Sequence, residues 1–569
     1  MGTDSFLVNA MREFAPKVNT DILNGLTVPQ MQFFEKSIDE MWKTVAKDFP
    51  PPLKYRGYHV CQPDEEFINE PRQKRGSRPE VDVAPNDIYM TKYLFDFIDK
   101  DGVVEKISFY MFLPFVREAG TLMLSGARYV ISPMLGDVVL SYENGKVFCQ
   151  FSRAKFHIHN VMHTLMIDDT VSSFNIPWAR LYNLSTSKET IRISLLHYML
   201  AKYGLRGTFK KFMPKVPVLF FDESPDPEQY PADQWVTIKS HKPTIKPFYG
   251  GTNVVVLAKR SEWEAAPFWS KTMMASLYYI LDRFGSGGAA IWGGEMRAAE
   301  KWSEDTTHWR LLMGLILWER TKNPAIIVED IHKHISSLDR YIDDMVRPRA
   351  QRIGFTGRDL YDFFAMCVEC WEDWALNWYK KSAPVYDKEL NVLYQVNNKI
   401  MQAIFKFYFD LENEVAKAPI TADTVRKLLK DKIKTRMIFH IRKDSNSYVT
   451  PIAYSGDNKF CKITATVVPQ KGNSAGGDGA GAASVRLHAS IGEVTSALNL
   501  TKKESTGLTR FNPYVQLDNL MYVRRNPNVS WLTDKVQAIL DQDMKTDLPS
   551  TLSDDLDIDE LRRGAGDDD

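Results

Sequence analysis

The most informative stretch of this sequence is FLPFVREAGTLMLSGARYVISPMLGD, Phe112–Asp137. Two short apolar runs flank Ser125-Gly126, and small residues between such runs are typical of a tight turn between two strands. The spacing therefore predicts a β-hairpin hinged at Ser125-Gly126. Arg128 follows the turn directly, although a core hairpin needs no charge there. We expect Arg128 either to lie on a solvated face or to have a functional contact.

The regions around this hairpin differ in their hydrophobic period. Residues 1 to about 50 have a helical spacing of apolar residues, and Pro50-Pro51-Pro52 stops that helix. Residues 53 to about 150 alternate as strands do, and Asn144-Gly145 lies between two alternating runs, which is a strong hairpin signal. From about 190 to 400 helical patterns dominate. The sequence predicts a mixed α+β, multi-domain protein.

Length and charge set further limits. A chain of 569 residues exceeds one typical domain, so we expect several cores. The formal net charge is zero, with 72 basic and 72 acidic residues, so the total charge does not indicate a nucleic-acid-binding protein. The distribution is uneven, because Arg426–Lys443 is strongly basic whereas Asp541–Asp569 contains eleven acidic and three basic residues. Residues 470–484 are Gly-rich and predict a flexible loop.

Neither a membrane nor an oxidising compartment is indicated. No apolar run reaches the roughly 18 residues that span a bilayer, and the N-terminus lacks the layout of a signal peptide. Five scattered cysteines do not make a disulfide framework, so we expect a reducing, intracellular setting.

Candidate catalytic and metal-binding residues are few. His157, His159 and His163 have no acidic or cysteine partner at a ligand spacing, so we expect structural or surface roles for them. Cys367 and Cys370 form a single CxxC pair in a helical pattern, and a structural zinc site needs a second pair. We expect no catalytic residue and no metal ligand in this chain.

Four stretches of the chain resemble the β subunit of multisubunit RNA polymerases, in the order and at spacings that fit that family. The first is the opening stretch, where Leu113-Pro114, Gly120-Thr121, Ser125-Gly126 and Arg128 follow the pattern of the β-subunit protrusion. The other three are SKETIRISLLHYMLAKYGLRGTF (Ser187–Phe209), YDKELNVLYQVNNKIMQAIFKFYFDLE (Tyr386–Glu412) and ALNLTKKESTGLTRFNPY (Ala497–Tyr514).

The resemblance implies a β-subunit fold of the protrusion and lobe type with a partly irregular fork region. Its parts would be residues 1–145 as the first protrusion segment, 146–386 as an inserted lobe, 387–447 as the second protrusion segment, 448–535 as a fork- or rifampicin-region-like segment, and 536–569 as a disordered acidic tail. The family's later motifs are missing from the sequence, as in the split subunits of giant phiKZ-like bacteriophages.

In that role the chain would form one jaw of the DNA cleft and contact template and downstream fork. Lysine and arginine side chains suit phosphate contacts, which supply affinity without reading bases. The candidate nucleic-acid contacts are Lys502, Lys503, Gly507 and Arg510 by resemblance, Arg426, Lys427, Lys430 and Lys434 from the basic run, and Arg128 from the hairpin. An ordinary amphipathic helix with its cations in solvent is the alternative reading of the basic run.

The resemblance also implies the partners and the cofactor. The partners would be the other phage polymerase chains, namely the β C-terminal-like and β′-like halves, together with DNA template and RNA. No cofactor would be bound by this chain, and the Mg²⁺ of nucleotidyl transfer would belong to the β′-like partner. The chain would act in the cytoplasm of the host cell or in the phage replication compartment, and packaging in the virion remains open.

Two other classes of function are compatible with the residues. A phage structural or assembly protein could use the helical middle for assembly and the acidic tail for a partner, without any nucleic-acid chemistry. A soluble enzyme such as a group transferase would need a compact set of acid, base, nucleophile or metal ligands, and the sequence does not contain one.

Overall fold

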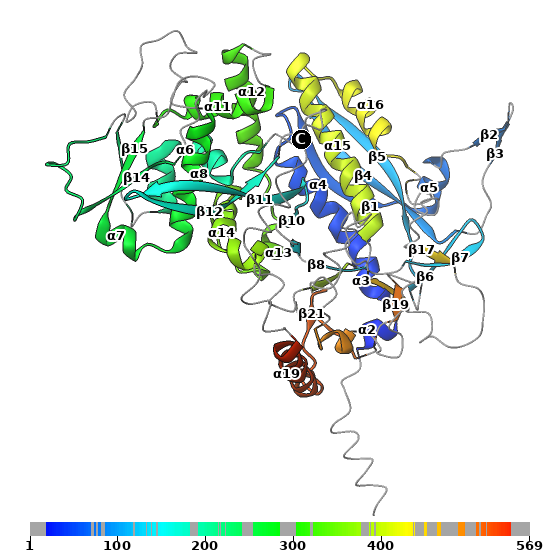
Figure 1. The fold of residues 1–569 in the computed structure, drawn as a ribbon. Helices are drawn as coiled ribbons and strands as arrows, with labels where there is room; N and C mark the ends of the chain where they lie inside the picture. Colours follow the sequence, from blue (N-terminus) through cyan, green and yellow to red (C-terminus); the bar gives the residue numbers. More distant parts are fainter. Residues whose placement is uncertain are drawn as a thin grey trace, which may run out of the picture. The chain divides into compact units, whose positions relative to one another are not determined.

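In the computed structural model of the chain, the described residues divide into two compact units (Figure 1). Unit 1 takes its residues from Met1–Asp137, Ser382–Asp478 and Val485–Asp569, and unit 2 from Val138–Lys381. The structure describes residues 19–24, 26–69, 73–75, 78–80, 86–117, 120–131, 134–137, 139–143, 146–181, 192–213, 216, 218–221, 224–241, 254–284, 303–318, 323–376, 386, 388–391, 394–435, 437, 449–451, 464–467, 488–494, 508–510, 512, 514–518 and 521–547.

Unit 1 contains one long antiparallel sheet and several small ones. Its strands are β1 (Leu53–Val60), β2 (Gln73–Arg75), β3 (Arg78–Glu80), β4 (Ile88–Ile98), β5 (Val104–Pro114), β6 (Thr121–Leu124), β7 (Ala127–Ile131), β8 (Met134–Asp137), β16 (Lys388–Asn391), β17 (Val449–Pro451), β18 (Thr464–Val467), β19 (Leu508–Arg510), β20 (Gln516–Leu517) and β21 (Val523–Arg524). Its helices are α2 (Thr20–Leu23), α3 (Thr27–Gln32), the π-helix η1 (Phe33–Ser37), α4 (Ile38–Ala46), α5 (Pro63–Asn69), α15 (Tyr394–Lys417), α16 (Ala422–Lys432), α18 (Ile491–Val494) and α19 (Ser530–Asp547).

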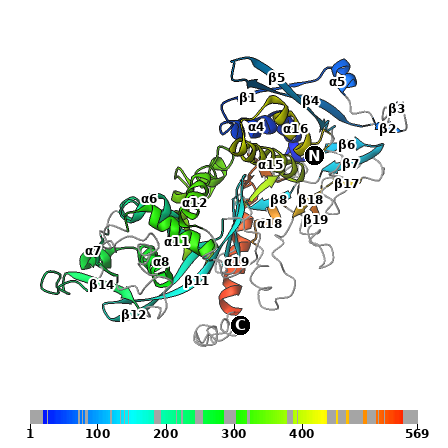
Figure 2. The same cartoon turned by 90° about the horizontal axis from the view of Figure 1, so that it is seen from above.

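The main core of unit 1 lies between the sheet β1-β4-β5 and the helices α4, α15 and α16 (Figures 1 and 2). Trp42 of α4 is fully buried, and its ring meets Tyr55 of β1, Phe95 of β4 and Phe407 of α15 at centroid distances of 5.9, 5.2 and 5.8 Å. Large aromatic side chains bury more apolar area than other residues and dominate core energetics. This cluster therefore joins residues near the start of the chain to residues beyond 400.

The opening stretch supplies strands to two smaller sheets of unit 1. The predicted hairpin is confirmed, because β6 and β7 are antiparallel and Ser125 and Gly126 between them have φ angles of 51° and 79°. The stretch continues into β8, which pairs with β16 on one side and with β18 on the other. Partners far along the chain thus determine where Phe112–Asp137 lies.

Unit 2 is built on a seven-stranded sheet with the path β13-β15-β14-β11-β10-β9, where β12 also pairs with β11. Its strands are β9 (Leu140–Glu143), β10 (Lys146–Gln150), β11 (Lys155–Ile167), β12 (Thr170–Ala179), β13 (Val218–Phe221), β14 (Trp235–Ser240) and β15 (Val255–Lys259). Its helices are α6 (Leu195–Phe212), α7 (Arg260–Ala265), α8 (Phe268–Phe284), α11 (Thr306–Trp318), α12 (Pro324–Leu338), α13 (Arg347–Arg352), α14 (Leu360–Glu369) and the π-helix η3 (Glu372–Leu376). Helix α8 packs on β11, β12 and β14 and contacts α6 and α14.

The structure confirms the mixed α+β, multi-domain prediction and corrects one part of it. The predicted disorder of 536–569 is wrong for residues 536–547, because these belong to helix α19. The prediction failed because Thr533 and Gln537 of this helix bond to residues of 489–493, a long-range contact that composition cannot reveal. Residues 548–569 and the Gly-rich segment 470–484 lie outside the described residues. In the described part of the chain, no helix is long and apolar enough to cross a bilayer.

Candidate nucleic-acid interface

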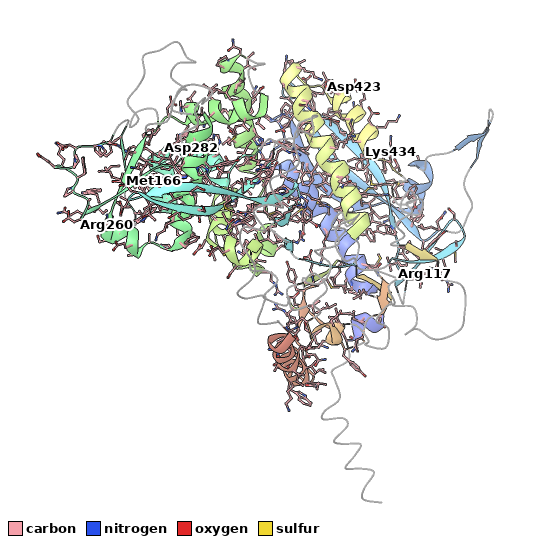
Figure 3. The ribbon with its side chains drawn as sticks, viewed as in Figure 1. Arg117, Met166, Arg260, Asp282, Asp423 and Lys434 are labelled. Carbon is pink, nitrogen blue, oxygen red and sulfur yellow. The ribbon has the colours of Figure 1, made fainter. Side chains whose placement is uncertain are left out.

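Helix α16 contains the first part of the basic run, Arg426–Lys432, and one face of the helix is anchored in unit 1. Thr421 caps its N-terminus, where its Oγ1 accepts a hydrogen bond from the Thr424 amide at 3.3 Å. Val425 and Leu429 are buried, and the helix packs on β5 and α15. The alternative prediction of an amphipathic helix is therefore confirmed. Figure 3 labels Asp423 and Lys434 near its two ends.

The cations of this segment fall into two groups. Arg426 forms ion pairs with Glu105 of β5 and with Asp423, at 2.9 Å for the latter, and these hydrogen bonds raise its pKa, with Glu105 contributing most. Lys432 pairs with Asp410 of α15 at 2.6 Å between Nζ and Oδ2. These two side chains join α16 to its neighbours. They are consequently less available to a phosphate than an exposed lysine is.

The second group consists of Lys427, Lys430 and Lys434. All three side chains are exposed, and none pairs with an acidic side chain of the described residues. The backbone fixes the position of Lys434, because the carbonyl of the next residue, Thr435, accepts a hydrogen bond from Phe112 N at 2.9 Å. The basic run is thus tied to the first residue of the opening stretch.

Arg128 is exposed on β7, one residue beyond the turn, opposite Met123 of β6. The neighbouring strand β6 is held by a residue that the sequence did not single out. Asp87 is buried, and its carboxylate accepts hydrogen bonds from Arg117 Nη2 at 2.5 Å and from Met123 N at 2.8 Å. Arg117, also labelled in Figure 3, is therefore a structural partner of this carboxylate.

The fork-like segment is described only in part. The backbone of Arg510 ends β19, where it pairs with Thr464 of β18, and β18 in turn pairs with β8. Lys502, Lys503 and Gly507 lie outside the described residues. The structure thus brings the backbone of Arg510 into the same four-stranded sheet as the end of the opening stretch.

A possible metal-binding group among the described residues is formed by His59, Cys61 and Glu65. Their ligand atoms lie within 4.8 Å of one another. Both carboxylate oxygens of Glu65 already have basic partners, Lys92 at 2.8 Å and His59 at 3.0 Å, and burial raises the pKa of the Cys61 thiol to about 11. An ion-pair network beside a protonated thiol accounts for this cluster, and its donor set is not the oxygen set that Mg²⁺ prefers.

The histidines and cysteines that we considered as metal ligands have structural surroundings. His159 stacks on Trp178 with ring centroids 4.6 Å apart, and burial lowers its pKa to about 4, so it is neutral at pH 7. His163 Nε2 lies 3.1 Å from Asp282 Oδ2. Cys367 is fully buried on α14. Each of these three side chains is thus held by ring stacking, a polar contact or burial within unit 2.

A family model described as non-virion RNA polymerase subunit matches residues 7–541. The chain belongs to this family. A search of the curated proteins finds no match. The match includes both units, the hairpin, α16 and most of α19.

This polymerase subunit is therefore a component of a phage multisubunit RNA polymerase, and other polymerase chains are its partners. The complex to which it contributes is a nucleotidyltransferase that acts in transcription. The non-virion designation does not support the possibility that the chain is packaged in the virion.

Proposed function

We propose that this polymerase subunit is the N-terminal, β-like part of a split β subunit, with unit 1 as the protrusion and unit 2 as the inserted lobe. One observation carries the proposal. The chain leaves unit 1 after β8 and returns as β16, and these two strands are antiparallel neighbours with Asp137 opposite Lys388. Unit 2 is thus inserted at a single point in a sheet of unit 1, which is the arrangement that the resemblance implies for a lobe in a protrusion.

The positions of the resembling stretches give further support. The opening stretch contains β8, the stretch Tyr386–Glu412 contains β16, and the stretch Ala497–Tyr514 contains β19. All three strands belong to one sheet with the order β16-β8-β18-β19. The stretch Ser187–Phe209 contains α6, a helix of unit 2. Segments that are hundreds of residues apart are therefore adjacent in the fold.

In this proposal the subunit forms one jaw of the DNA cleft and contacts template and downstream fork. Lys427, Lys430 and Lys434 are the described cations best placed for phosphate, since the first two are exposed on the anchored helix α16 and Lys434 is exposed just beyond its end. Arg128, Arg426, Lys502, Lys503, Gly507 and Arg510 complete the proposed contacts. The Mg²⁺ of nucleotidyl transfer would be held by a β′-like partner, and this chain would supply no catalytic residue.

The test replaces Lys427, Lys430 and Lys434 with alanine in the fully assembled polymerase. Each lost phosphate contact lowers the slope of log affinity against log salt by about 0.9 on duplex DNA, so we expect a decrease of roughly 2 to 3. The matched control removes three exposed lysines from other elements of unit 1, Lys36, Lys54 and Lys100. It should leave the slope near that of the unchanged complex.

If the complex that lacks Lys427, Lys430 and Lys434 had the same salt slope as the unchanged complex, the proposed phosphate contacts of these lysines would be contradicted. The isolated subunit should incorporate no nucleotide, and robust activity without partner chains would refute the noncatalytic assignment. If the subunit purified from infected cells carried only capsid or tail proteins, the alternative of a structural or assembly protein would replace the proposal.

A further inference from the structure

Helix α19 has an unusual distribution of side chains, because two polar residues contact the rest of unit 1 whereas large apolar residues are exposed. Thr533 is buried and donates its hydroxyl to Glu493 Oε1 at 2.6 Å, and Gln537 Oε1 accepts from the Ala489 amide at 2.9 Å. A surface helix of a globular protein normally buries its apolar stripe and exposes its polar face. Contact with unit 1 therefore does not explain the apolar residues of α19.

Those apolar residues form a continuous stripe. Leu532, Val536 and Ile539 follow the i, i+4, i+7 spacing of a helix that inserts into a groove, and Leu540 extends the stripe. Their exposed fractions are 47%, 40%, 57% and 38%. Contiguous apolar surface of this kind is typical of interaction sites. Trp531 is not included, since Lys535 Nζ lies 5.2 Å from its ring centroid.

The charge at the end of the helix indicates the nature of the partner. Asp541, Asp543 and Asp547 belong to the last turns of α19, and in the sequence Asp543 and Asp547 follow Ile539 at intervals of four residues. Carboxylates at a helix C-terminus add to the negative end of the helix dipole and destabilise an isolated helix. A cationic partner surface would relieve this repulsion.

We propose that the stripe Leu532, Val536, Ile539 and Leu540 is the docking surface for another subunit of the same polymerase. The partner presents an apolar groove whose one end is edged by lysine or arginine and receives the acidic end of α19. The inference depends on membership in a polymerase subunit family, which supplies a partner chain, and not on the β-like assignment.

The experiment compares Ile539→Glu with Ala538→Glu in the subunit co-expressed with all other polymerase chains. Both positions are exposed and adjacent on the same helix, but only Ile539 belongs to the stripe. Buried apolar anchors dominate interface affinity, so Ile539→Glu should lower the recovery of partner chains by roughly tenfold or more. Ala538→Glu should retain them. Thermal unfolding of the isolated subunit should be unchanged by either substitution.

A second variant tests the charge. Asp543→Lys combined with Asp547→Lys should weaken association most at low salt, where repulsion between like charges is least screened. Equal recovery of partner chains by the two glutamate variants would overturn the proposal. So would an isolated subunit that is a dimer and becomes a monomer with Ile539→Glu, since the stripe would then bind a second copy. Both of these outcomes concern α19 alone, so they leave the salt-slope experiment on Lys427, Lys430 and Lys434 independent.

Discussion

At the scale of single residues, the two arginines of the opening stretch, Arg117 and Arg128, have different surroundings. Arg117 lies in the opening stretch and is held by the buried carboxylate of Asp87, 30 residues earlier in the chain. The backbone of Asp87 is bonded to Met123 as well, since Asp87 N donates a hydrogen bond to Met123 O at 2.7 Å. Arg128 is exposed on β7. The sequence could identify Arg117 and Arg128 as unusual, but only the structure shows that Arg117 pairs with a buried carboxylate, whereas Arg128 is exposed on β7.

We predict that Asp87→Ala destabilises the protein by about 1–3 kcal/mol, because the Met123 amide and the Arg117 guanidinium both lose their acceptor. Asp87→Asn should restore part of this stability, since its side-chain oxygen can still accept a hydrogen bond. The measurement is the free energy of unfolding in denaturant. Asp101→Ala, at an exposed turn position, is the control and should change it by less than about 0.5 kcal/mol. Equal effects at the two positions would contradict the anchoring role of Asp87.

At the scale of elements, helix α6 contains an interruption that a helical sequence pattern does not reveal. Helical patterns dominate the sequence from about residue 190, and α6 begins at Leu195 after Ser194, whose side chain caps it. Gly204 interrupts the helix with φ of 69° and ψ of −179°. At this interruption Leu205 N donates to Ser303 O, and Arg206 N donates to the Glu304 carboxylate, each at 3.0 Å. The kink is therefore fixed by a segment a hundred residues away.

We predict that Gly204→Ala lowers the free energy of unfolding by more than about 2 kcal/mol. A Cβ at this position would lie 2.6 Å from the Glu304 carbonyl oxygen, and its left-handed φ disfavours any side chain. Gly492→Ala is the matched control, because Gly492 has no atom within 4 Å of an added Cβ. That substitution should be neutral or slightly stabilising. Thermal denaturation of both variants gives the change in the free energy of unfolding. A Gly204→Ala protein as stable as the unchanged protein would contradict the prediction.

At the scale of the whole molecule, the insertion of unit 2 between two paired strands has a thermodynamic consequence. Unit 1 has its own aromatic core around Trp42, and β8 and β16 pair within unit 1. The ends of the inserted segment are therefore close together, as in domains that tolerate insertion or removal of a second domain. Unit 2 likewise has its own sheet and buried helices.

We predict that replacing Val138–Lys381 with a short Gly-Ser linker leaves unit 1 folded and cooperative in thermal unfolding. The adjacent strands β8 and β16 keep the cost of closing the loop small. Circular dichroism and the fluorescence of Trp42 in a variant with Trp531→Phe report the result. The contrary outcome is an aggregated or non-cooperative protein, which would mean that unit 1 depends on unit 2. A second deletion that removes β16 as well should fail to fold and serves as the control.

Local sequence patterns were sufficient for the elements whose cause is local. The turn at Ser125-Gly126, the N-terminal helical spacing with Phe34, Ile38 and Trp42 inside, and the mixed α+β composition all follow from period and turn chemistry. Periods of 2 and 3.6 place side chains on faces without reference to the rest of the chain. The same local signals explain why α16 was predicted as an amphipathic helix.

The tertiary structure alone decided which of these elements meet and which charges are exposed. Long-range pairing placed β8 between β16 and β18. An ion pair with Glu105 connects Arg426 to β5. Hydrogen bonds to residues of 489–493 hold helix α19, part of which composition predicted to be disordered. Each of these contacts joins residues far apart in sequence, and a local pattern carries no information about such partners. The sequence therefore determined the elements and their basic and acidic character, whereas tertiary pairing determined the sheet, the exposed lysines and the apolar stripe of α19.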